Sequence, residues 1–469
     1  MALSVEAASD LIVDKLFPLW QTEDERLERI DHWYRWRQED IPLPRNATRE
    51  LKTLVELCKT PWLALVVSSL SQCLYVDGYR SRLDKVEADE ETEPSGPWKT
   101  WHANDMDRRQ IAVHRAALAY GYAFVSVLPG TDDEGKRSVM RGVSPRKVYA
   151  VWEDPAEDEY PVYALRVDSR GKGKGYTLRL YDDVAIYVFT MDSATDKPVY
   201  VQEEFRQHDA GVCPFVRYAN MLDLDGRCDG EVEPFIPAAG RINKTTYDRL
   251  LTQHFNSWKI RTVSGMAEPD NEEDANRKKL KLRQDDILVA EDPDTKFGTL
   301  DETPLDGFVT AWRSDIEALA AVTQTPTHAL TGQLVNLSAE ALSAARAGLS
   351  QKVTERQKSF GASHVQALRL AAHLEGDETH ANDRLSRVTW QDMEIRSLSQ
   401  AVDALGKAAT MLQIPLPALW QRVPGVEKSD VDEWRRMATE MDPMDRLTAE
   451  LARQSQTREP PAREPAPAA

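Results

Sequence analysis

The feature that most constrains the fold is a stretch of helical character at residues 338–375. Ser338 is a good N-cap residue and Glu340 places a negative charge in the first turn. The helix can continue to Leu374, which at 1.5 Å per residue gives a length of roughly 55 Å. A helix of this length packs against other helices or other chains, and an antiparallel helical hairpin within one core is the simpler alternative. Its apolar stripe consists of Leu342, Ala345, Leu349, Val353, Phe360, Val365, Leu368 and Ala372.

Two glycines interrupt this long helix. Gly348 and Gly361 each cost about 1 kcal/mol relative to alanine in a helix interior. They therefore predict either bends in the helix or places where another part of the protein comes very close.

A second helix and a polar segment precede the long helix. Thr303 can cap this second helix, Pro304 suits its first position and Pro326 ends it. Its apolar side chains, at helical spacing, include Phe308, Trp312 and Ile316. The polar segment that follows is expected to be a conformationally free loop without Lys or Arg, and it contains Thr327, His328, Thr331, Gln333, Leu334 and Asn336.

Composition limits the class of protein. With 469 residues, 41% hydrophobic and 29% charged, the chain can form two or three globular domains with real cores. No apolar run reaches the roughly 20 residues that span a bilayer, and the N-terminus lacks a signal-peptide pattern, so no membrane partner is expected. The four cysteines form no CxxC pair and are expected to be reduced thiols.

The net charge of −18 argues against a protein whose main affinity is for phosphate backbones. It is compatible with a surface that lets DNA pass without holding it, because like charges oppose adhesion. One dense basic run stands out against this background, and its acidic flanks favour a solvated face or pairing between subunits over contact with nucleic acid. The run consists of Arg277, Lys278, Lys279, Lys281 and Arg283.

The rest of the chain mixes helices with a β-rich region. Helices are expected at 5–38, 48–72, 105–120 and 234–258, and again at 397–412, 417–422 and 429–440. Strands are expected at 123–128, 148–152, 162–167, 176–181, 184–190, 199–205 and 388–390. The glycines at 171–175 predict a hairpin turn rather than a phosphate-binding loop. The fold class is therefore α+β and predominantly helical.

No recognisable catalytic or metal-binding motif is present. The sequence lacks a GxSxG, HExxH, Walker or kinase pattern and a zinc-type Cys/His spacing. The acidic stretch at 221–233 misses the register of a calcium loop. We therefore predict no catalytic residue, cofactor or metal site.

The order of elements resembles the portal proteins of tailed bacteriophages, of the siphophage type. Two helices flank a small mixed module, and a polar loop and a very long helix follow. The residues that carry the resemblance are Val76 to Tyr79, Gly211, Pro214, Asn220, Pro234, Asn243, Phe297 to Leu300, Leu305, Ile316 to Pro326, Asn336 to Leu342, Leu349 to Val353, Arg356, Gln357, Phe360, Gly361, Thr389, Trp390, Lys407, Ile414 and Pro415.

The resemblance implies a homo-oligomeric ring, usually of twelve subunits, at one capsid vertex of the virion, assembled in the host cytoplasm. Double-stranded DNA would pass through the ring, and the terminase, a head-tail adaptor, the major capsid protein and scaffolding protein would be its partners. The implied regions are wing 1–233, stem helix 234–258, clip 259–303, stem helix 304–324, tunnel loop 325–337, kinked wing helix 338–375, crown 376–445 and a disordered tail 446–469.

The resemblance also implies residue roles. Phe308, Trp312 and Ile316 would pack between neighbouring stems, and Gln333, Leu334 and Asn336 would gate the channel by their bulk. Two other functions remain open from the residues alone. One is a helical interaction scaffold that acts as a monomer or dimer, and the other is an unrecognised hydrolase or nucleic-acid-processing enzyme.

Overall fold

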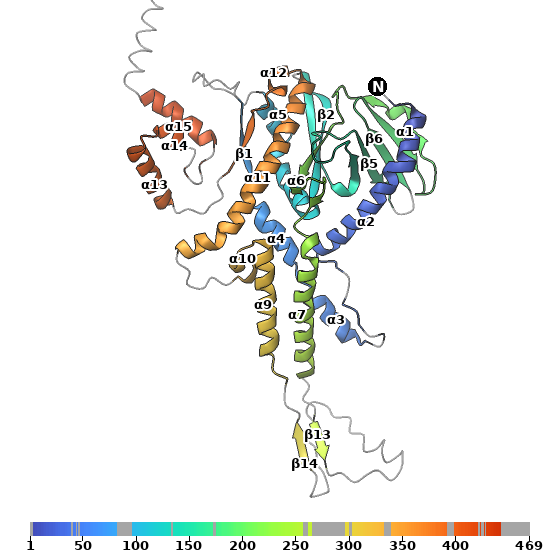
Figure 1. Cartoon of the computed structure of the whole chain (residues 1–469), viewed down its shortest axis with the longest axis vertical. Coiled ribbons are helices and arrows are strands. Elements are labelled where there is room, and N and C mark those ends of the chain that lie inside the picture. The colour runs from blue at the N-terminus through green and yellow to red at the C-terminus, as the bar shows by residue number, and fades with distance from the viewer. Residues whose placement is uncertain are drawn as a thin grey trace, which may run out of the picture. The chain divides into compact units, whose positions relative to one another are not determined.

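The chain folds into two compact units (Figure 1). One unit, hereafter unit 1, comprises Met1–Glu28, Val67–Glu231 and Leu349–Ala469, and the other, unit 2, comprises Arg29–Val66 and Val232–Gly348. Helices predominate over strands, which confirms the predicted α+β class. The computed structural model describes residues 3–38, 41–43, 45, 47–81, 96–132, 135–171, 175–256, 261–264, 296–299, 303–332, 339–391, 398–420, 423, 426 and 428–441.

Unit 1 is built on an antiparallel sheet with strand order β4-β5-β6-β7-β8, in which β9 also pairs with β7. Its strands are β4 (Val148–Val151), β5 (Tyr163–Ser169), β6 (Tyr176–Tyr181), β7 (Ala185–Met191), β8 (Val199–Tyr200) and β9 (Arg206–Gln207). Because side chains alternate along a strand, Leu178, Leu180 and Tyr187 share one face. That face packs against Ile12 and Leu16 of the N-terminal helical segment.

The N-terminal segment covers this sheet face as one nearly continuous helix (Figure 1). It consists of α1 (Val5–Leu11), a π-helical turn (Ile12–Leu16) and α2 (Phe17–Tyr34), as the sequence predicts for 5–38. The β5–β6 connection is the predicted hairpin, and its glycines Gly171 and Gly175 adopt φ of 110° and 78°. The expected strand 199–205 is wrong, since a 3-10 turn (Gln202–Glu204) separates β8 from β9.

A second sheet in unit 1 has the order β10-β2-β3. It consists of β2 (Tyr122–Asp132), β3 (Gly135–Val143) and β10 (Phe215–Ala219). The sequence predicted that β2 would end before Pro129, and it missed β3. Pro129 is tolerated in β2 for a geometric reason. The Val127 N–H donates to the carbonyl oxygen of Pro214, on the β10 side, and an N–H at position 129 would point to the same side. β10 has ended at that level, so the missing N–H of proline leaves no acceptor unsatisfied.

Several further helices and short strand pairs complete unit 1. Helices α5 (Pro97–Ala103) and α6 (Met106–Tyr120) lead into β2, and β1 (Val76–Arg80) pairs with β15 (Arg387–Trp390). Short pairs and turns connect the rest, namely β11 (Met221–Leu222), β12 (Cys228–Asp229) and α12 (Glu378–Ala381). The C-terminal helices α13 (Leu398–Met411), α14 (Leu416–Leu419) and α15 (Lys428–Met441) lie close to their predicted positions.

The expected single helix over 48–72 is wrong. The chain forms α3 (Arg49–Cys58) and α4 (Trp62–Ser71), separated at Lys59, whose ψ of 117° is extended. By length and hydropathy alone, the stretch Arg49–Ser71 as a whole is long and apolar enough to cross a membrane. Each of its two helices has 10 residues, about half the number that a bilayer requires.

A chain of buried polar side chains joins α6, β10 and the long helix α11 (Ala339–Glu375) in unit 1. His114 contacts the carbonyl oxygen of Leu74 through Nδ1 at 3.2 Å, and its Nε2 lies 2.8 Å from Nε2 of His364. A carbonyl only accepts, so Nδ1 of His114 carries the proton and Nε2 accepts from His364. Nδ1 of His364 then accepts from the Tyr218 hydroxyl at 2.9 Å. The three side chains thus form one neutral, directional network.

Burial opposes charge in this network. It lowers the pKa of His114 to about 4, and burial together with the neighbouring His114 holds the pKa of His364 well below its usual value. In the unfolded chain both imidazoles accept protons near pH 6.5. The unfolded state therefore binds more protons between about pH 6.5 and pH 4, and stability falls as the pH falls through that range.

We predict that unit 1 loses stability, on the order of 3 kcal/mol, between pH 7 and pH 4 because of these imidazoles. The thermal unfolding midpoint of the double variant His114→Gln/His364→Gln should depend less steeply on pH than that of the wild type. A His32→Gln variant, changed at an exposed histidine, should keep the wild-type slope. An unchanged slope in the double variant would contradict the prediction.

Candidate functional site

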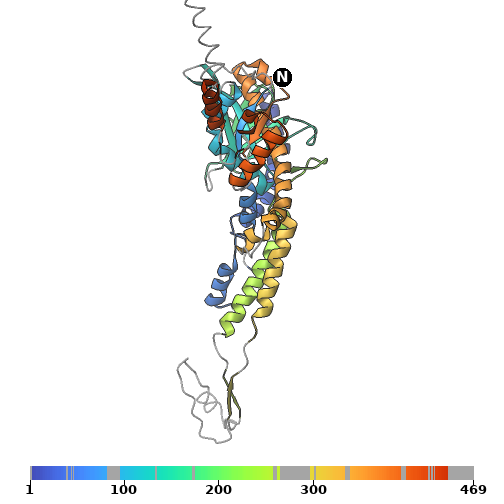
Figure 2. The ribbon, with the colours of Figure 1, turned by 90° about the vertical axis from the view of Figure 1, so that its left-hand side faces the viewer.

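The core of unit 2 is an antiparallel helical hairpin of α7 (Ile236–Asn256) and α9 (Asp306–Thr323), which lie side by side in both views (Figures 1 and 2). The two helices bury side chains against each other, and α7 also packs against α3, where Tyr247 contacts Val55 and Cys58. The buried side chains include Ile242, Asn243, Thr246 and Tyr247 of α7, and Ile316, Leu319, Ala320 and Thr323 of α9. An ion pair from Arg241 to Asp315 at 2.7 Å crosses between the helices.

The open end of the hairpin is closed by one side chain. The Asn256 amide donates to the carbonyl oxygen of Thr303 at 2.9 Å and accepts from the Thr303 N–H at 3.4 Å. Thr303 therefore lies outside the helix, and α9 begins at Asp306 with Leu305 as its N-cap. The predicted start, with Thr303 as cap and Pro304 as first residue, is early by two residues because this long-range contact cannot be seen in local sequence.

One predicted intersubunit residue is wrong. Ile316 is 0% exposed within its own chain, so it has no surface left for a neighbour. Trp312 is half-buried, with its ring 6.3 Å from the ring of Trp62 and 5.7 Å from the Arg249 guanidinium. Phe308 is half-buried as well.

Sequence reasoning missed the apolar side chains that the hairpin does expose. Phe255 of α7 is 58% exposed, and Val309 and Val322 of α9 are 38% and 59% exposed. The signal that could have found them is the stripe itself. The buried residues of α9 recur at helical spacing along one side of the helix. Val309 precedes them and Val322 lies beside them, so a neighbour that covers them leaves both valines exposed.

Helix α9 ends in a tight turn. Gln324 takes a left-handed conformation with φ of 55°, and Thr325 donates its N–H to the carbonyl oxygen of Ala320 at 3.0 Å, five residues back. These are features of a Schellman motif, in which glycine is the usual left-handed residue. The hydroxyls of Thr323 and Thr325, both buried, lie 3.0 Å apart and bond to one another.

The segment predicted as a free loop, 325–337, is partly helical. After Pro326, the one-turn helix α10 (Thr327–Thr331) forms, buries Leu330 and ends at Gly332, whose φ is 68°. Thr327 is exposed, His328 is half-buried, and the Thr331 hydroxyl donates to the carbonyl oxygen of Thr327 at 3.0 Å. Gln333, Leu334 and Asn336 lie outside the described residues.

Helix α11 begins at Ala339 and ends at Glu375, within one residue of the prediction at each end. The boundary between the two units falls inside it, between Gly348 and Leu349. A Cβ on Gly361 would lie 3.5 Å from Trp390 and from Val388, and one on Gly348 would lie 3.8 Å from Gln324. A Cβ at Gly361 would therefore make ordinary van der Waals contact with β15, so this packing does not require glycine, and a bend at either glycine stays a prediction.

A buried ion cluster fixes α11 in unit 1. Lys352 and Arg356 both contact the Glu231 carboxylate, and Arg356 reaches it at 3.2 Å. All three are buried, and the Asn220 amide donates to the same carboxylate at 3.3 Å. Removing one partner of such a cluster leaves an uncompensated buried charge, which costs several kcal/mol. The cluster therefore fixes the register of α11 on unit 1.

The module between α7 and α9 is described only in part. β13 (Arg261–Ser264) pairs antiparallel with β14 (Lys296–Thr299). The basic run of Arg277, Lys278, Lys279, Lys281 and Arg283 lies outside the described residues. In the part of the chain that is described, no group of three His, Cys, Asp or Glu side chains is placed to hold a metal ion.

The burial pattern of α9 predicts two different outcomes for two apolar side chains. Ile316→Ala should lower the stability of the isolated chain by about 2–5 kcal/mol, because it leaves a cavity in the hairpin. Val322→Ala should change it by less than about 1 kcal/mol, because that side chain is already exposed. Thermal unfolding of the two variants measures the difference, and equal shifts would show that the burial is misassigned.

The chain was compared with known proteins. The family model described as "Phage portal protein, SPP1 Gp6-like" matches residues 16–444, which include all of unit 2, most of unit 1 and every helix and strand described after α1 and the first residues of the π-helical turn. No curated protein matches the chain. The matched region contains the hairpin of α7 and α9, the turn at Gln324 and the long helix α11, in the order that suggested the resemblance. The chain therefore belongs to the family of SPP1 Gp6-like phage portal proteins, which are structural proteins of the phage capsid with a role in DNA packaging.

Proposed function

We propose that copies of this chain close into a ring at one capsid vertex, and that the ring encloses a channel for genomic DNA during packaging and ejection. The observation that carries the proposal is the exposure of Phe255, Val309 and Val322 on the hairpin of α7 and α9. Val309 and Val322 are 13 residues apart on α9, so at about 100° per residue they lie on different sides of the helix, as contacts with two neighbouring hairpins would require. In a ring, each hairpin would lie between two others and cover these side chains.

We assign the regions of the ring from the order of the elements. The wing is 1–233, the stem helices are 234–258 and 304–324, the clip is 259–303 and the crown is 376–445. The terminase and the head-tail adaptor would dock on the clip, and the capsid and scaffolding proteins on the wing. Phe308 and Trp312, with their half-buried rings, join the three exposed apolar residues as proposed contacts between neighbouring stems.

The channel lining follows from charge. The segment 325–337 contains no Lys or Arg, and the whole chain carries a net charge of −18. A lining of this kind does not hold phosphates, so DNA can move past it in either direction. We propose that Gln333, Leu334 and Asn336 restrict the channel by their bulk rather than by gripping the DNA. The short helix α10, ending at Gly332, would hold the base of this segment.

The ring itself predicts a mass. Twelve copies of the 53.0 kDa chain give a particle of about 636 kDa in native mass spectrometry. The purified chain should show this species, or a neighbouring closed number of copies, in equilibrium with smaller forms. A chain that stays monomeric under all assembly conditions would contradict the proposed ring.

The exposed apolar side chains predict an assembly-specific defect. Phe255→Asp and Val322→Asp should abolish the large species while leaving the thermal unfolding midpoint of the monomer within about 2 °C of wild type, because the positions are exposed in the free chain. Thr195→Asp adds the same charge at an exposed site on unit 1 and serves as the control. If both hairpin variants assemble as the control does, these residues do not form the interface.

A further inference from the structure

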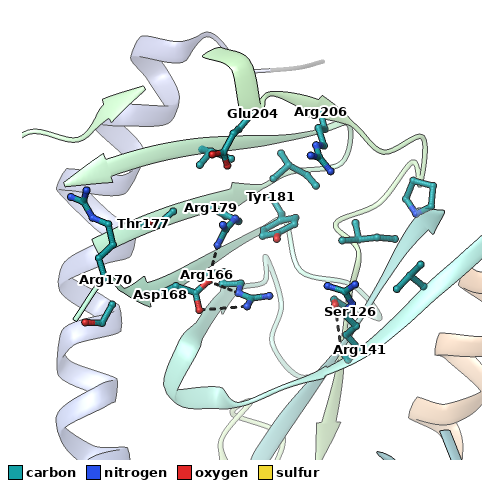
Figure 3. A pocket seen from close by; sticks show the side chains of 16 residues that line it. Ser126, Arg141, Arg166, Asp168, Arg170, Thr177, Arg179, Tyr181, Glu204 and Arg206 are labelled. Atoms are coloured by element: carbon teal, nitrogen blue, oxygen red, sulfur yellow. Dashed lines mark hydrogen bonds and ion pairs between the residues drawn. The ribbon is translucent and has the colours of Figure 1, made fainter. Parts of the chain in front are cut away.

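Unit 1 contains a cavity of about 610 Å³ between its two sheets, within the size range of ligand sites (Figure 3). Along β5, β6 and β7, every second side chain packs into the core, and the side chains between them line the cavity. Arg166 and Asp168 alternate with Leu165 and Val167, and Arg179 alternates with Leu178 and Leu180. The opposite wall comes from β2 and β3, with Leu128, Val139 and Arg141.

Five arginines line this cavity, in a chain with a large negative net charge. They are Arg141, Arg166, Arg170, Arg179 and Arg206, and the only acidic residues in the lining are Asp168 and Glu204. Arg166 and Arg179 are directly opposite each other on β5 and β6, a pairing of like charges that is unfavourable without a counter-charge. An excess of positive charge therefore surrounds one concave site.

Asp168 shows how the site accepts a carboxylate. It lies 2.8 Å from Arg166 and 2.7 Å from Arg179, and Lys147 approaches it at 3.5 Å. Partial burial alone would raise the pKa of Asp168, but the hydrogen bond and charge of Arg166, with Lys147 and Arg179, lower it overall. Arg170 pairs at 2.6 Å with Asp192, which is well exposed. A carboxylate thus already occupies one corner of the cavity.

The remaining two arginines have no ion-pair partner among the described residues. Arg141 on β3 and Arg206 on β9 come from different sheets and face each other across the cavity in Figure 3. The ring of Tyr181 and the apolar side chains of Ile186 and Val188 also line the cavity. The outer edge of β3 near this site is already occupied, since Asn104 bonds to Ser138 and Met140, so a ligand would enter the cavity rather than extend the sheet.

We propose that this cavity, hereafter the arginine pocket, binds an acidic peptide segment of a partner protein. Planar guanidinium groups bind carboxylates in a fixed two-point geometry, as they do around Asp168, and the apolar floor suits a neighbouring apolar side chain of the same peptide. A nucleic acid fits less well, because its phosphate chain offers no apolar side chain to pack against Ile186 and Val188. The proposal is independent of ring formation.

A binding experiment on the purified full chain tests the proposal. The probe is a fluorescein-labelled peptide of alternating glutamate and leucine, followed by fluorescence anisotropy at physiological salt. Arg141→Gln/Arg206→Gln should weaken binding by about tenfold or more, because both unpaired guanidinium groups are lost. Arg384→Gln/Arg387→Gln removes the same charge from two exposed arginines outside the pocket and should leave binding within about twofold.

The outcomes separate the possible ligands. Loss of binding in the pocket variant alone supports the proposal, with unchanged thermal unfolding showing that the variant is folded. Equal losses in both double variants would mean that the peptide responds to overall charge only, and would overturn it. Absence of peptide binding to the wild type would overturn it as well. So would a labelled DNA oligonucleotide or inorganic pyrophosphate that binds more tightly than the peptide and depends on the same two arginines.

Discussion

The packing of α7 against α9 is the interaction on which unit 2 depends. The hairpin buries Ile242, Ile316 and Leu319, is closed by Asn256 and is crossed by the Arg241–Asp315 ion pair. Helix α3 also packs on α7, yet Phe255 and Val322 remain exposed. Burying an apolar side chain of this size is worth about 1.5–3 kcal/mol, so repeated copies of the hairpin have a physical reason to associate side by side.

Unit 1 contains most of the long helix α11 and must hold it in one position. Buried ion pairs and directed hydrogen bonds hold this helix, in addition to apolar packing. Lys352 and Arg356 of α11 pair with Glu231, and the His114–His364–Tyr218 network ties the same helix to α6 and β10 about two turns after Arg356. Buried polar contacts of this kind permit one register and leave others with unsatisfied groups. The sheets behind them leave a concave, arginine-lined face free for a partner.

Local patterns in the sequence predict elements well where a signal and the fold agree. The helix at 338–375, the strand at 176–181 and the hairpin at its start follow from spacing, caps and glycines that act over a few residues. The order of these elements also carried the resemblance to portal proteins, which the family match bears out. The predictions failed where contacts between residues far apart in the sequence determine where a helix or strand begins or ends. Asn256 shifts the start of α9, Lys59 divides a helix, and the end of β10 makes room for Pro129 in a strand.

The candidate site shows the same division. Helical spacing places Ile316 on an apolar side of the helix but cannot say whether its own chain or a neighbour covers it, and here its own chain buries it completely. The arginine pocket joins residues from six strands and the turns next to them, so no local window contains it. The alternation of Arg166 and Arg179 with leucine and valine indicates a polar sheet face, yet only the packing of two sheets makes that face concave.

The most direct test of the central claim is an electron-microscopy reconstruction of the assembled particles at a resolution that resolves side chains. The account predicts a closed ring with a central opening, in which Phe255 and Val322 of each hairpin contact a neighbouring copy. Particles without an opening, or a ring in which both side chains remain exposed to solvent, would contradict it.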